Sequence, residues 1–356
     1  MNRFDYIRPT SLDEAIAAAS QPGSAFLAAG TNLLDLMKGN VTRPDRIVDI
    51  TKLPDLDRIE TLEDGSTRIG ALVKNADLAY HEDFAARFPA VAEALLSGAS
   101  AQLRNAASVG GNLLQRTRCR YFYDTASACN KREPGSGCDS LEGENAGQAV
   151  LGWSPSCIAT HPSDFCVPLA GLGAIVEVKG PDGSRDVALT DFHRLPGDRP
   201  DIETVLAPGE LVVAIRLPAE AAGFAAHSRY LKLRERTSYA FALVSAAAML
   251  RFEDGVIAEA RIAIGSVAAK PWRAKSAEAV LKGMKAEPAF FEKAAREAFA
   301  EAKPSGDNAD KIELGRRIVA RALTLASAGT PAEMPALPAS PFAPLPGASA
   351  NGVAHV

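Results

Sequence analysis

Four of the five cysteines in this 356-residue chain lie in one segment that has almost no hydrophobic periodicity. They are Cys119, Cys129, Cys138 and Cys157, and the residues around them are rich in Arg, Lys, Gly and Asn. A segment of this length without a helix or strand pattern has too little apolar surface to hold itself in one conformation. Four thiolates around a metal or a metal cluster would supply the missing constraint.

The spacing of these cysteines favours an iron–sulfur cluster. Successive cysteines are separated by nine, eight and eighteen residues, whereas structural zinc sites usually contain close cysteine pairs, about two to four residues apart. Disulfides are disfavoured in a chain made in the cytoplasm. Zinc and unligated thiols stay open as alternatives. Cationic neighbours would offset the negative charge of a cluster; they are Arg116, Arg118, Arg120, Lys131 and Arg132.

Two further residues near this segment are weaker ligand candidates. Cys166 lies in the apolar run 165–169, where a cysteine usually acts as a small buried hydrophobe. His161 lies close to Cys157 in the sequence and could be an alternative ligand. A hydrogen-bonded loop histidine is the simpler interpretation.

Two glycine-containing segments are candidates for phosphate binding, because small residues let backbone N–H groups approach an anion closely. The first comprises Phe26, Leu27, Ala28, Ala29, Gly30, Thr31, Asn32, Leu33 and Leu34, and the second comprises Ser108, Val109, Gly110, Gly111 and Asn112. Each segment alone could be an ordinary tight turn. Two in one α/β region favour a ligand with a diphosphate group, although neither has the pattern of a standard nucleotide-binding motif.

Composition places the chain among globular proteins and argues against nucleic acid as a partner. It is 47% hydrophobic and 23% charged, with a net charge of −4. The longest nearly apolar run, residues 239–250, is too short to span a bilayer. The N-terminus shows no apolar signal region. We therefore expect a chain made in the cytoplasm that stays there, or reaches the periplasm by co-export with a signal-bearing partner.

Local patterns predict alternating strands and helices, then an antiparallel sheet. Ser11 and Glu14 form a capping box at the start of a helix. A hairpin is predicted over residues 174–189. Three strands between residues 228 and 265 and three helices between 277 and 325 follow. Tyr230, Lys232 and Arg234 alternate on one of these strands and share a face, which could be simply solvated.

Taken together, these segments resemble the FAD-binding medium subunit of the molybdenum hydroxylases, the xanthine dehydrogenase and carbon monoxide dehydrogenase family. The matching motifs are residues 28–38, 102–105, 108–113 and 163–164, and the resemblance covers residues 1–325. The cysteine segment from residue 116 to 138 is similar, more narrowly, to the flavin subunit of bacterial aldehyde oxidoreductases of the periplasmic type, which carries a [4Fe–4S] cluster beside FAD.

The resemblance implies an α+β fold. Residues 1–220 would form a FAD-binding region of the vanillyl-alcohol-oxidase (PCMH) type, with subdomains 1–55 and 56–220 and an iron–sulfur insertion at 115–158. Residues 225–326 would form a C-terminal domain of the CO dehydrogenase flavoprotein type, an antiparallel sheet with helices. Composition predicts that the proline- and alanine-rich tail at 329–356 is disordered.

The resemblance also implies roles for individual residues. The FAD pyrophosphate would lie between the two glycine-containing segments. Asp164 would bind the adenosine side, and Val212 and Lys232 would line the flavin. The cluster ligands would be Cys119, Cys129, Cys138 and Cys157, with no role for Cys166.

By this resemblance the chain is the electron-transfer subunit of a heterotrimeric molybdenum aldehyde oxidoreductase. Partner subunits would hold the molybdenum cofactor and two [2Fe–2S] clusters, and electrons would leave FAD for an external acceptor. No catalytic residue is expected in the chain itself. The alternatives are a flavin subunit of the xanthine, CO or hydroxybenzoyl-CoA type, a self-sufficient flavin oxidase with structural zinc, and an assembly scaffold that has lost FAD.

Overall fold

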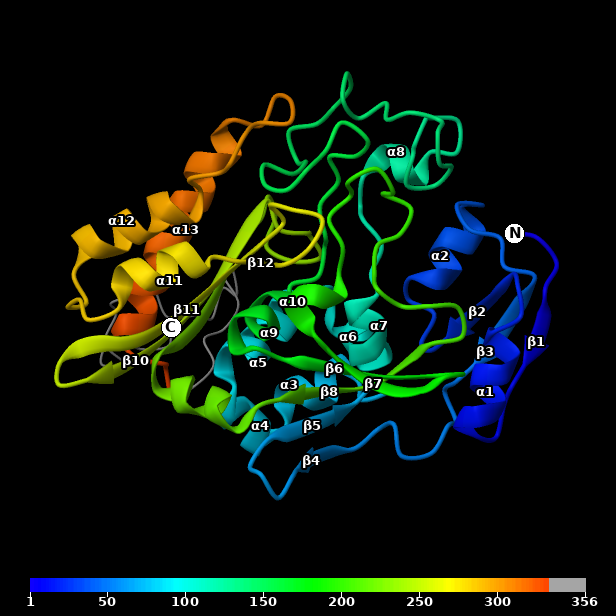
Figure 1. The fold of residues 1–356 in the computed structure, drawn as a ribbon, viewed down its shortest axis with the longest axis horizontal. Helices are drawn as coiled ribbons and strands as arrows, with labels where there is room; N and C mark the ends of the chain where they lie inside the picture. The colour runs from blue at the N-terminus through cyan, green and yellow to red at the C-terminus, as the bar shows by residue number, and fades with distance from the viewer. Residues whose placement is uncertain (333–356) are drawn as a thin grey trace, which may run out of the picture.

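The computed structural model describes residues 1–332 and arranges them around three β-sheets (Figure 1). The tail predicted at 329–356 lies outside the described residues from position 333 onward. Among the described residues, no helix combines the length and the apolar character needed to cross a bilayer.

The first sheet is small, parallel and N-terminal, with the strand order β1-β3-β2. Its elements are β1 (Asp5–Ile7), α1 (Leu12–Ala19), β2 (Ser24–Leu27), α2 (Leu33–Lys38) and β3 (Arg46–Asp49). The Ser11 cap of the predicted capping box is confirmed, but the Glu14 carboxylate binds the Thr10 amide in place of the Ser11 amide. Ser11 Oγ accepts from the Glu14 amide at 3.2 Å, and Glu14 Oε2 accepts from the Thr10 amide at 2.8 Å.

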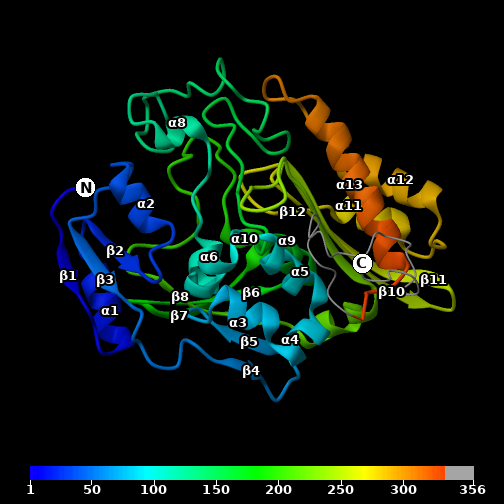
Figure 2. The same cartoon turned by 180° about the vertical axis from the view of Figure 1, so that it is seen from behind.

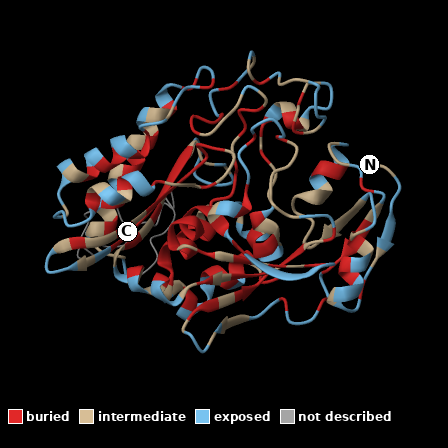
Figure 3. Ribbon diagram, in the orientation of Figure 1, coloured by how far each residue is buried: buried red, intermediate tan, exposed pale blue. Residues whose placement is uncertain are grey.

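The second sheet is antiparallel, with five strands in the order β4-β5-β8-β6-β7. The strands are β4 (Ile59–Thr61), β5 (Thr67–Gly70), β6 (Ile175–Gly180), β7 (Gly183–Ala188) and β8 (Leu211–Leu217). Strands β6 and β7 form the predicted hairpin. Short helices lie beside this sheet in the middle of the molecule, where buried residues are concentrated (Figure 3). They are α3 (Asn75–Tyr80), α4 (Glu82–Arg87), α5 (Pro89–Ser97), α6 (Ala101–Ala106), α7 (Val109–Leu113), α9 (Cys166–Leu172) and α10 (Leu189–Phe192).

The third sheet is C-terminal and antiparallel, in the order β12-β11-β10-β9. Its strands and helices are β9 (Ser228–Leu233), β10 (Val244–Glu253), β11 (Val256–Gly265), β12 (Trp272–Arg273), α11 (Lys275–Leu281), α12 (Pro288–Ala298) and α13 (Asp310–Ser327), and the 3-10 helix η1 (Ala219–His227) precedes them. Ala246 and Ala248 belong to the core shared with α11–α13, whereas Ala247 and Met249 belong to the core shared with α5 and α9. Strand β10 is therefore buried on both faces, which explains its continuous apolar sequence.

The buried carboxylate of Glu93 joins α5 to β9 within the core that contains Ala247 and Met249. Glu93 accepts hydrogen bonds from Arg229 Nε at 3.0 Å and from the Tyr230 amide at 2.6 Å. Burial raises the pKa of Glu93, and the nearby Arg229 guanidinium opposes that rise. The C-terminal sheet is thus joined to the central helices by a charged pair as well as by apolar packing.

The cysteine segment runs between α7 and α9 as loops with one short helix, α8 (Arg120–Tyr123). In both views it lies along one edge of the molecule, between α2 and the C-terminal helices (Figures 1 and 2). Contacts from outside hold it: the amides of Val150 and Leu151 both donate to Val267 O at 2.9 Å, and the Lys303 amide donates to Val150 O at 2.8 Å. The predicted lack of regular structure is confirmed.

Asp49, at the end of β3, anchors the N-terminal sheet through several hydrogen bonds. Its carboxylate accepts from the Thr51 amide at 2.9 Å, from Thr51 Oγ1 at 2.6 Å, from Arg8 and from Tyr6. Burial alone would raise the pKa of Asp49, but these hydrogen bonds outweigh it and lower the pKa to about 2.

We expect Asp49→Asn to destabilise the protein at pH 7 by about 2 kcal/mol, because a carboxyl pKa lowered in the folded state stabilises that state above its unfolded pKa. The difference between wild type and variant should shrink as the pH falls below about 4 and approach zero only below about pH 2. Urea unfolding at several pH values measures this. A difference that is constant across this range would contradict the assignment.

Candidate functional site

A large cavity of about 1050 Å³ opens where the first sheet, the central helices and the loop after β9 meet. Ligand pockets in proteins typically measure about 300–1,000 Å³, so this cavity is large enough for an extended dinucleotide. Its wall includes residues from the first glycine-containing segment, from α7, from β8 and from the loop that contains Tyr239 and Phe241.

Most of the predicted cofactor-binding residues line this large cavity. They are Phe26, Ala28, Ala29, Gly30, Thr31, Asn32, Leu33, Ser108, Gly110, Gly111, Asn112, Asp164 and Val212. Three others, Leu27, Leu34 and Lys232, do not belong to its wall. The structure therefore brings both glycine-containing segments, Asp164 and Val212 around one space.

In the first segment, Gly30 makes the chain turn toward the cavity. Its φ of +78° lies in the left-handed region that favours glycine. A Cβ at this position would lie 2.7 Å from Leu34 Cδ1. Leu34 therefore packs beneath the turn, which explains why it lies behind the cavity wall.

The second segment, expected to be a loop, is the short helix α7. Ser108 caps it and accepts from the Gly111 amide at 3.4 Å. Gly110 packs against Ala71, the residue that follows β5, and its amide donates to Ala71 O at 2.9 Å. A Cβ at position 110 would lie 2.7 Å from Ala71 Cβ. Gly110 is therefore needed so that the backbone of α7 can pack closely against Ala71. The Ser108 cap and this packing together compensate for the low helix propensity of the paired glycines.

Asp164 and Lys232 form a buried pair at the base of the large cavity. Lys232 Nζ donates to Asp164 Oδ2 at 2.8 Å and to Ser97 O at 3.1 Å. The Tyr230 hydroxyl donates to Asp164 Oδ1 at 2.5 Å. Burial, and then the Asp164 charge, raise the pKa of Tyr230 well above its usual value. Tyr230 and Lys232 therefore face the protein interior, and the expectation that they could lie on a solvated face is wrong.

Two residues of the large cavity were missed by sequence reasoning. Asn75 is the first residue of α3, and its buried Oδ1 has no hydrogen-bond partner within residues 1–332, which fits a polar ligand in the cavity. Arg118 donates to Asn32 Oδ1 at 2.6 Å and stacks over Phe241 at 4.8 Å. For Asn75 the only signal in the sequence was a polar residue a few positions after an apolar strand. For Arg118 it was a positive charge close to the cysteines.

The four cysteines of the predicted cluster line a second, small cavity, called here the cysteine cavity. Its wall comprises Thr117, Cys119, Tyr121, Phe122, Ala128, Cys129, Asn130, Lys131, Cys138, Ser140, Ser156, Cys157 and Ala159. An isolated β-bridge aligns Cys129 with Cys138. Cys119 lines both the cysteine cavity and the large cavity. All four cysteines are free thiols in the structure.

One buried cation, Lys131, lines the cysteine cavity, and the partly buried Arg116 lies near Cys129 but belongs to the wall of the large cavity. Lys131 Nζ donates to Pro200 O at 2.9 Å and to Glu203 Oε1 at 3.0 Å, and Arg116 also pairs with Glu203. Burial lowers the pKa of Lys131 and of Arg116. Burial raises the pKa of Cys157, and the positive charge of Lys131 opposes this rise. The site therefore combines sulfur ligands with positive charge that favours an anionic group.

The sulfurs of the cysteine cavity are not arranged around a single point. Within residues 1–332, no three of them have their Sγ atoms all within 4.8 Å of one another. A tetrahedral zinc ion with Zn–S bonds of about 2.3 Å requires sulfurs about 3.8 Å apart. His161 lies away from this cavity, beside Cys166 and His193.

Family models match both halves of the chain. The FAD binding domain in molybdopterin dehydrogenase matches residues 2–220, and the CO dehydrogenase flavoprotein C-terminal domain matches residues 229–327. The chain therefore belongs to the family of FAD-binding medium subunits of molybdenum hydroxylases, which are oxidoreductases.

Individual relatives agree with this assignment. The chain is 48% identical to the aldehyde oxidoreductase FAD-binding subunit PaoB of Escherichia coli, over 92% of this chain and 99% of PaoB. It is 28% identical to the carbon monoxide dehydrogenase medium chain of Afipia carboxidovorans, over 87% and 90% of the two chains. The solved carbon monoxide dehydrogenase from Hydrogenophaga pseudoflava aligns with a TM-score of 0.72 at 28% identity, covering 92% of this chain and 98% of that one. The predicted family and α+β fold are confirmed.

We expect Gly110→Ala to lower both stability and FAD content, because its Cβ would meet the Ala71 backbone as well as the Ala71 side chain. Such overpacking typically costs about 1–3 kcal/mol. Thermal unfolding and the ratio of flavin to protein absorbance measure the two effects. Gly147→Ala is the matched control, since Gly147 lines the same cavity and an added Cβ there meets nothing within 4 Å. Equal effects in both variants would contradict the prediction.

Proposed function

We propose that this chain is the FAD- and [4Fe–4S]-containing electron-transfer subunit of a heterotrimeric molybdenum enzyme that oxidises aldehydes to carboxylates. It receives electrons from [2Fe–2S] clusters on a small partner subunit and passes them through FAD to an external acceptor, while a large partner subunit holds the molybdenum cofactor. The observation that carries the proposal is the position of Cys119, which lines both the large cavity and the cysteine cavity.

The choice of aldehyde as the substrate class follows from the pattern of similarity. Identity is 48% to the aldehyde oxidoreductase subunit, but 28% and 29% to two carbon monoxide dehydrogenase medium chains and 27% to a xanthine dehydrogenase subunit. The match to the aldehyde oxidoreductase subunit also covers 99% of that chain, so the cysteine segment falls within the matched length. These comparisons favour the aldehyde branch over the other molybdenum hydroxylases.

FAD would occupy the large cavity with its pyrophosphate between the first glycine-containing segment and α7. Backbone N–H groups at both places suit phosphate oxygens. Asp164 retains acceptor capacity beyond its bonds to Tyr230 and Lys232 and can receive a ribose hydroxyl. Val212 would contact the flavin. Lys232 would act indirectly, by holding the Asp164 carboxylate in place.

A [4Fe–4S] cluster would occupy the cysteine cavity with Cys119, Cys129, Cys138 and Cys157 as ligands. Four thiolates are the usual ligand set of such a cluster. Because each thiolate binds a different iron, the sulfurs need not converge on one point, and their spacing supports a cluster over a single zinc ion. The cations Lys131 and Arg116 would partly neutralise it.

The chain itself contributes binding, orientation and shielding. The two cofactors supply the redox chemistry when bound. Phe241 and Arg118 stack on each other in the wall of the large cavity, and Arg118 also joins the cysteine segment to Asn32. No side chain of the chain is proposed to take a proton from the aldehyde.

We expect Cys138→Ser to lose the cluster, because one iron would lack its thiolate, whereas Cys166→Ala should keep it, because Cys166 lies outside the cysteine cavity. Iron analysis should give about four irons per chain for this subunit in the wild type and in Cys166→Ala. The flavin content should be the same in all three proteins.

The same measurement separates the alternatives. Flavin with zinc and without iron in the wild type would replace the proposal with a flavin oxidase stabilised by structural zinc. Protein without either flavin or iron would favour a scaffold. Iron loss in Cys166→Ala would contradict the assigned ligand set.

We expect the chain co-produced with its molybdenum and [2Fe–2S] partner subunits to reduce a dye with aldehyde as the electron donor. The isolated chain should not, because the oxidation occurs on the partner. Xanthine and carbon monoxide serve as matched control donors in the same dye assay. Turnover of either control that exceeds turnover of the aldehyde would contradict the proposed substrate class.

A further inference from the structure

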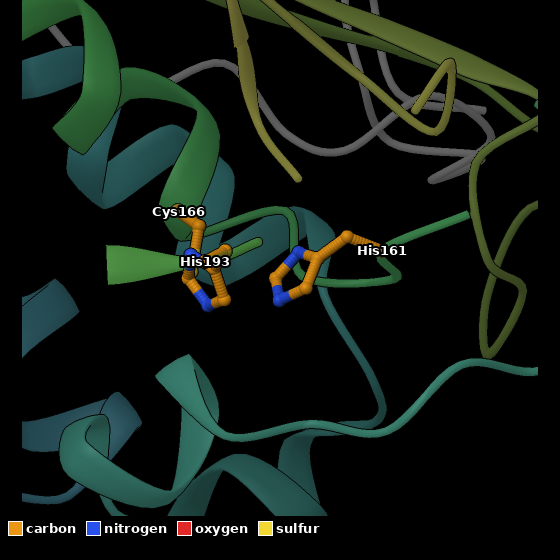
Figure 4. Close-up of side chains that lie close together, drawn as sticks. All are labelled: His161, Cys166 and His193. Carbon is orange, nitrogen blue, oxygen red and sulfur yellow. The ribbon is translucent and has the colours of Figure 1, made fainter. Parts of the chain in front are cut away.

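A second group of metal-binding side chains lies outside the cysteine cavity. His161, Cys166 and His193 each offer one ligand atom, and these three atoms all lie within 4.8 Å of one another (Figure 4). All three residues are buried, and the two imidazole rings have their centroids 4.4 Å apart. This group, called here the His–Cys site, comes from three separate segments of the chain.

Each of the three segments is held by its own hydrogen bond. The His161 amide donates to Ala268 O at 2.9 Å, and the Cys166 amide donates to Ser163 Oγ at 3.3 Å at the start of α9. His193, just after α10, places Nε2 at 2.8 Å from Leu113 O. The ligand atoms are thus positioned by the backbone before any ion binds.

Leu113 O lies near both imidazole rings, and one ring nitrogen of each histidine is left without a hydrogen bond in the described part of the chain. His161 Nε2 and His193 Nδ1 are fully buried, and neither has a hydrogen-bond partner among residues 1–332. Because a carbonyl oxygen only accepts, His193 Nε2 must carry the proton that binds Leu113 O, and its Nδ1 then presents a free lone pair. A backbone carbonyl that fixes the tautomer in this way is typical of metal-binding histidines.

We propose that the His–Cys site binds one thiophilic transition-metal ion, Zn²⁺ or Cu⁺, through His161, His193 and Cys166. Two imidazole nitrogens and one thiolate are a donor set that both ions accept. Tetrahedral binding with bonds of about 2.0 Å to nitrogen and 2.3 Å to sulfur needs donors about 3.3–3.5 Å apart. The side chains therefore need to move together only slightly. Binding releases the thiol proton of Cys166 to solvent.

In the sequence, His161 of the His–Cys site lies between a residue that lines the cysteine cavity and a residue that lines the large cavity. Ala159 lines the cysteine cavity, and Pro162 lines the large cavity. An ion that holds His161 to α9 and to the segment after α10 would therefore fix the wall between the two cofactor sites. The role is structural, and it does not depend on what the cysteine cavity contains.

The test is metal analysis of the full chain co-produced with its partner subunits, without chelators. We expect about one zinc or copper per chain in addition to iron and molybdenum. His193→Ala and Cys166→Ala should each lose that ion and keep iron. Cys138→Ser is the matched control that should lose iron and keep the ion. His81→Gln, a surface histidine, should change neither.

X-ray absorption at the zinc or copper edge identifies the ligands in the wild type, so the test does not depend on variants that fold poorly. A shell of two imidazole nitrogens at about 2.0 Å and one sulfur at about 2.3 Å supports the site for either ion. A shell of sulfur alone would place the ion in the cysteine cavity and overturn the inference. So would chelator-treated wild-type protein that takes up neither Zn²⁺ nor Cu⁺ on titration. Failure of the proposed function appears separately, as missing iron or flavin.

Discussion

The position of the cysteine segment depends on hydrogen bonds from the C-terminal domain. Lys311 of α13 donates from a buried Nζ to Gly147 O at 2.6 Å and to Gln148 O at 2.9 Å. Burial lowers the pKa of Lys311 to about 7. Together with the backbone hydrogen bonds to Val267, these contacts hold the cysteine segment in one conformation, which its own few apolar residues could not do. The walls of both cavities follow from where this segment is held.

Paired buried charges then shape the two cavities differently. In the wall of the large cavity the carboxylate of Asp164 has its charge balanced by Lys232. At the cysteine cavity Lys131, together with Arg116 from the wall of the large cavity, is balanced by Glu203. Isolated buried charges are costly, so each cavity carries its counterion within the protein. The large cavity is therefore suited to a ligand with hydroxyl donors, and the cysteine cavity is suited to an anionic cluster.

Local sequence patterns predicted the elements whose stability is local. The Ser11 cap of α1, the β6–β7 hairpin and strand β10 all follow from short-range signals. Helix α7 did not, because two glycines disfavour a helix and only the Ser108 cap and the contact with Ala71 make it possible. The alternation around Lys232 correctly indicated a shared face. It could not indicate that Asp164 lies opposite that face and pairs with Tyr230 and Lys232.

The sequence by itself was enough to indicate the family, and it predicted a metal centre in the cysteine segment and two glycine-containing segments that bind phosphate. These follow from residue type and spacing, which act over a few residues. Only the tertiary structure decided that Cys119 lines both cavities, and that His161 and His193, 32 residues apart, meet beside Cys166. Such proximities arise from packing between segments distant in sequence, and no local pattern encodes them.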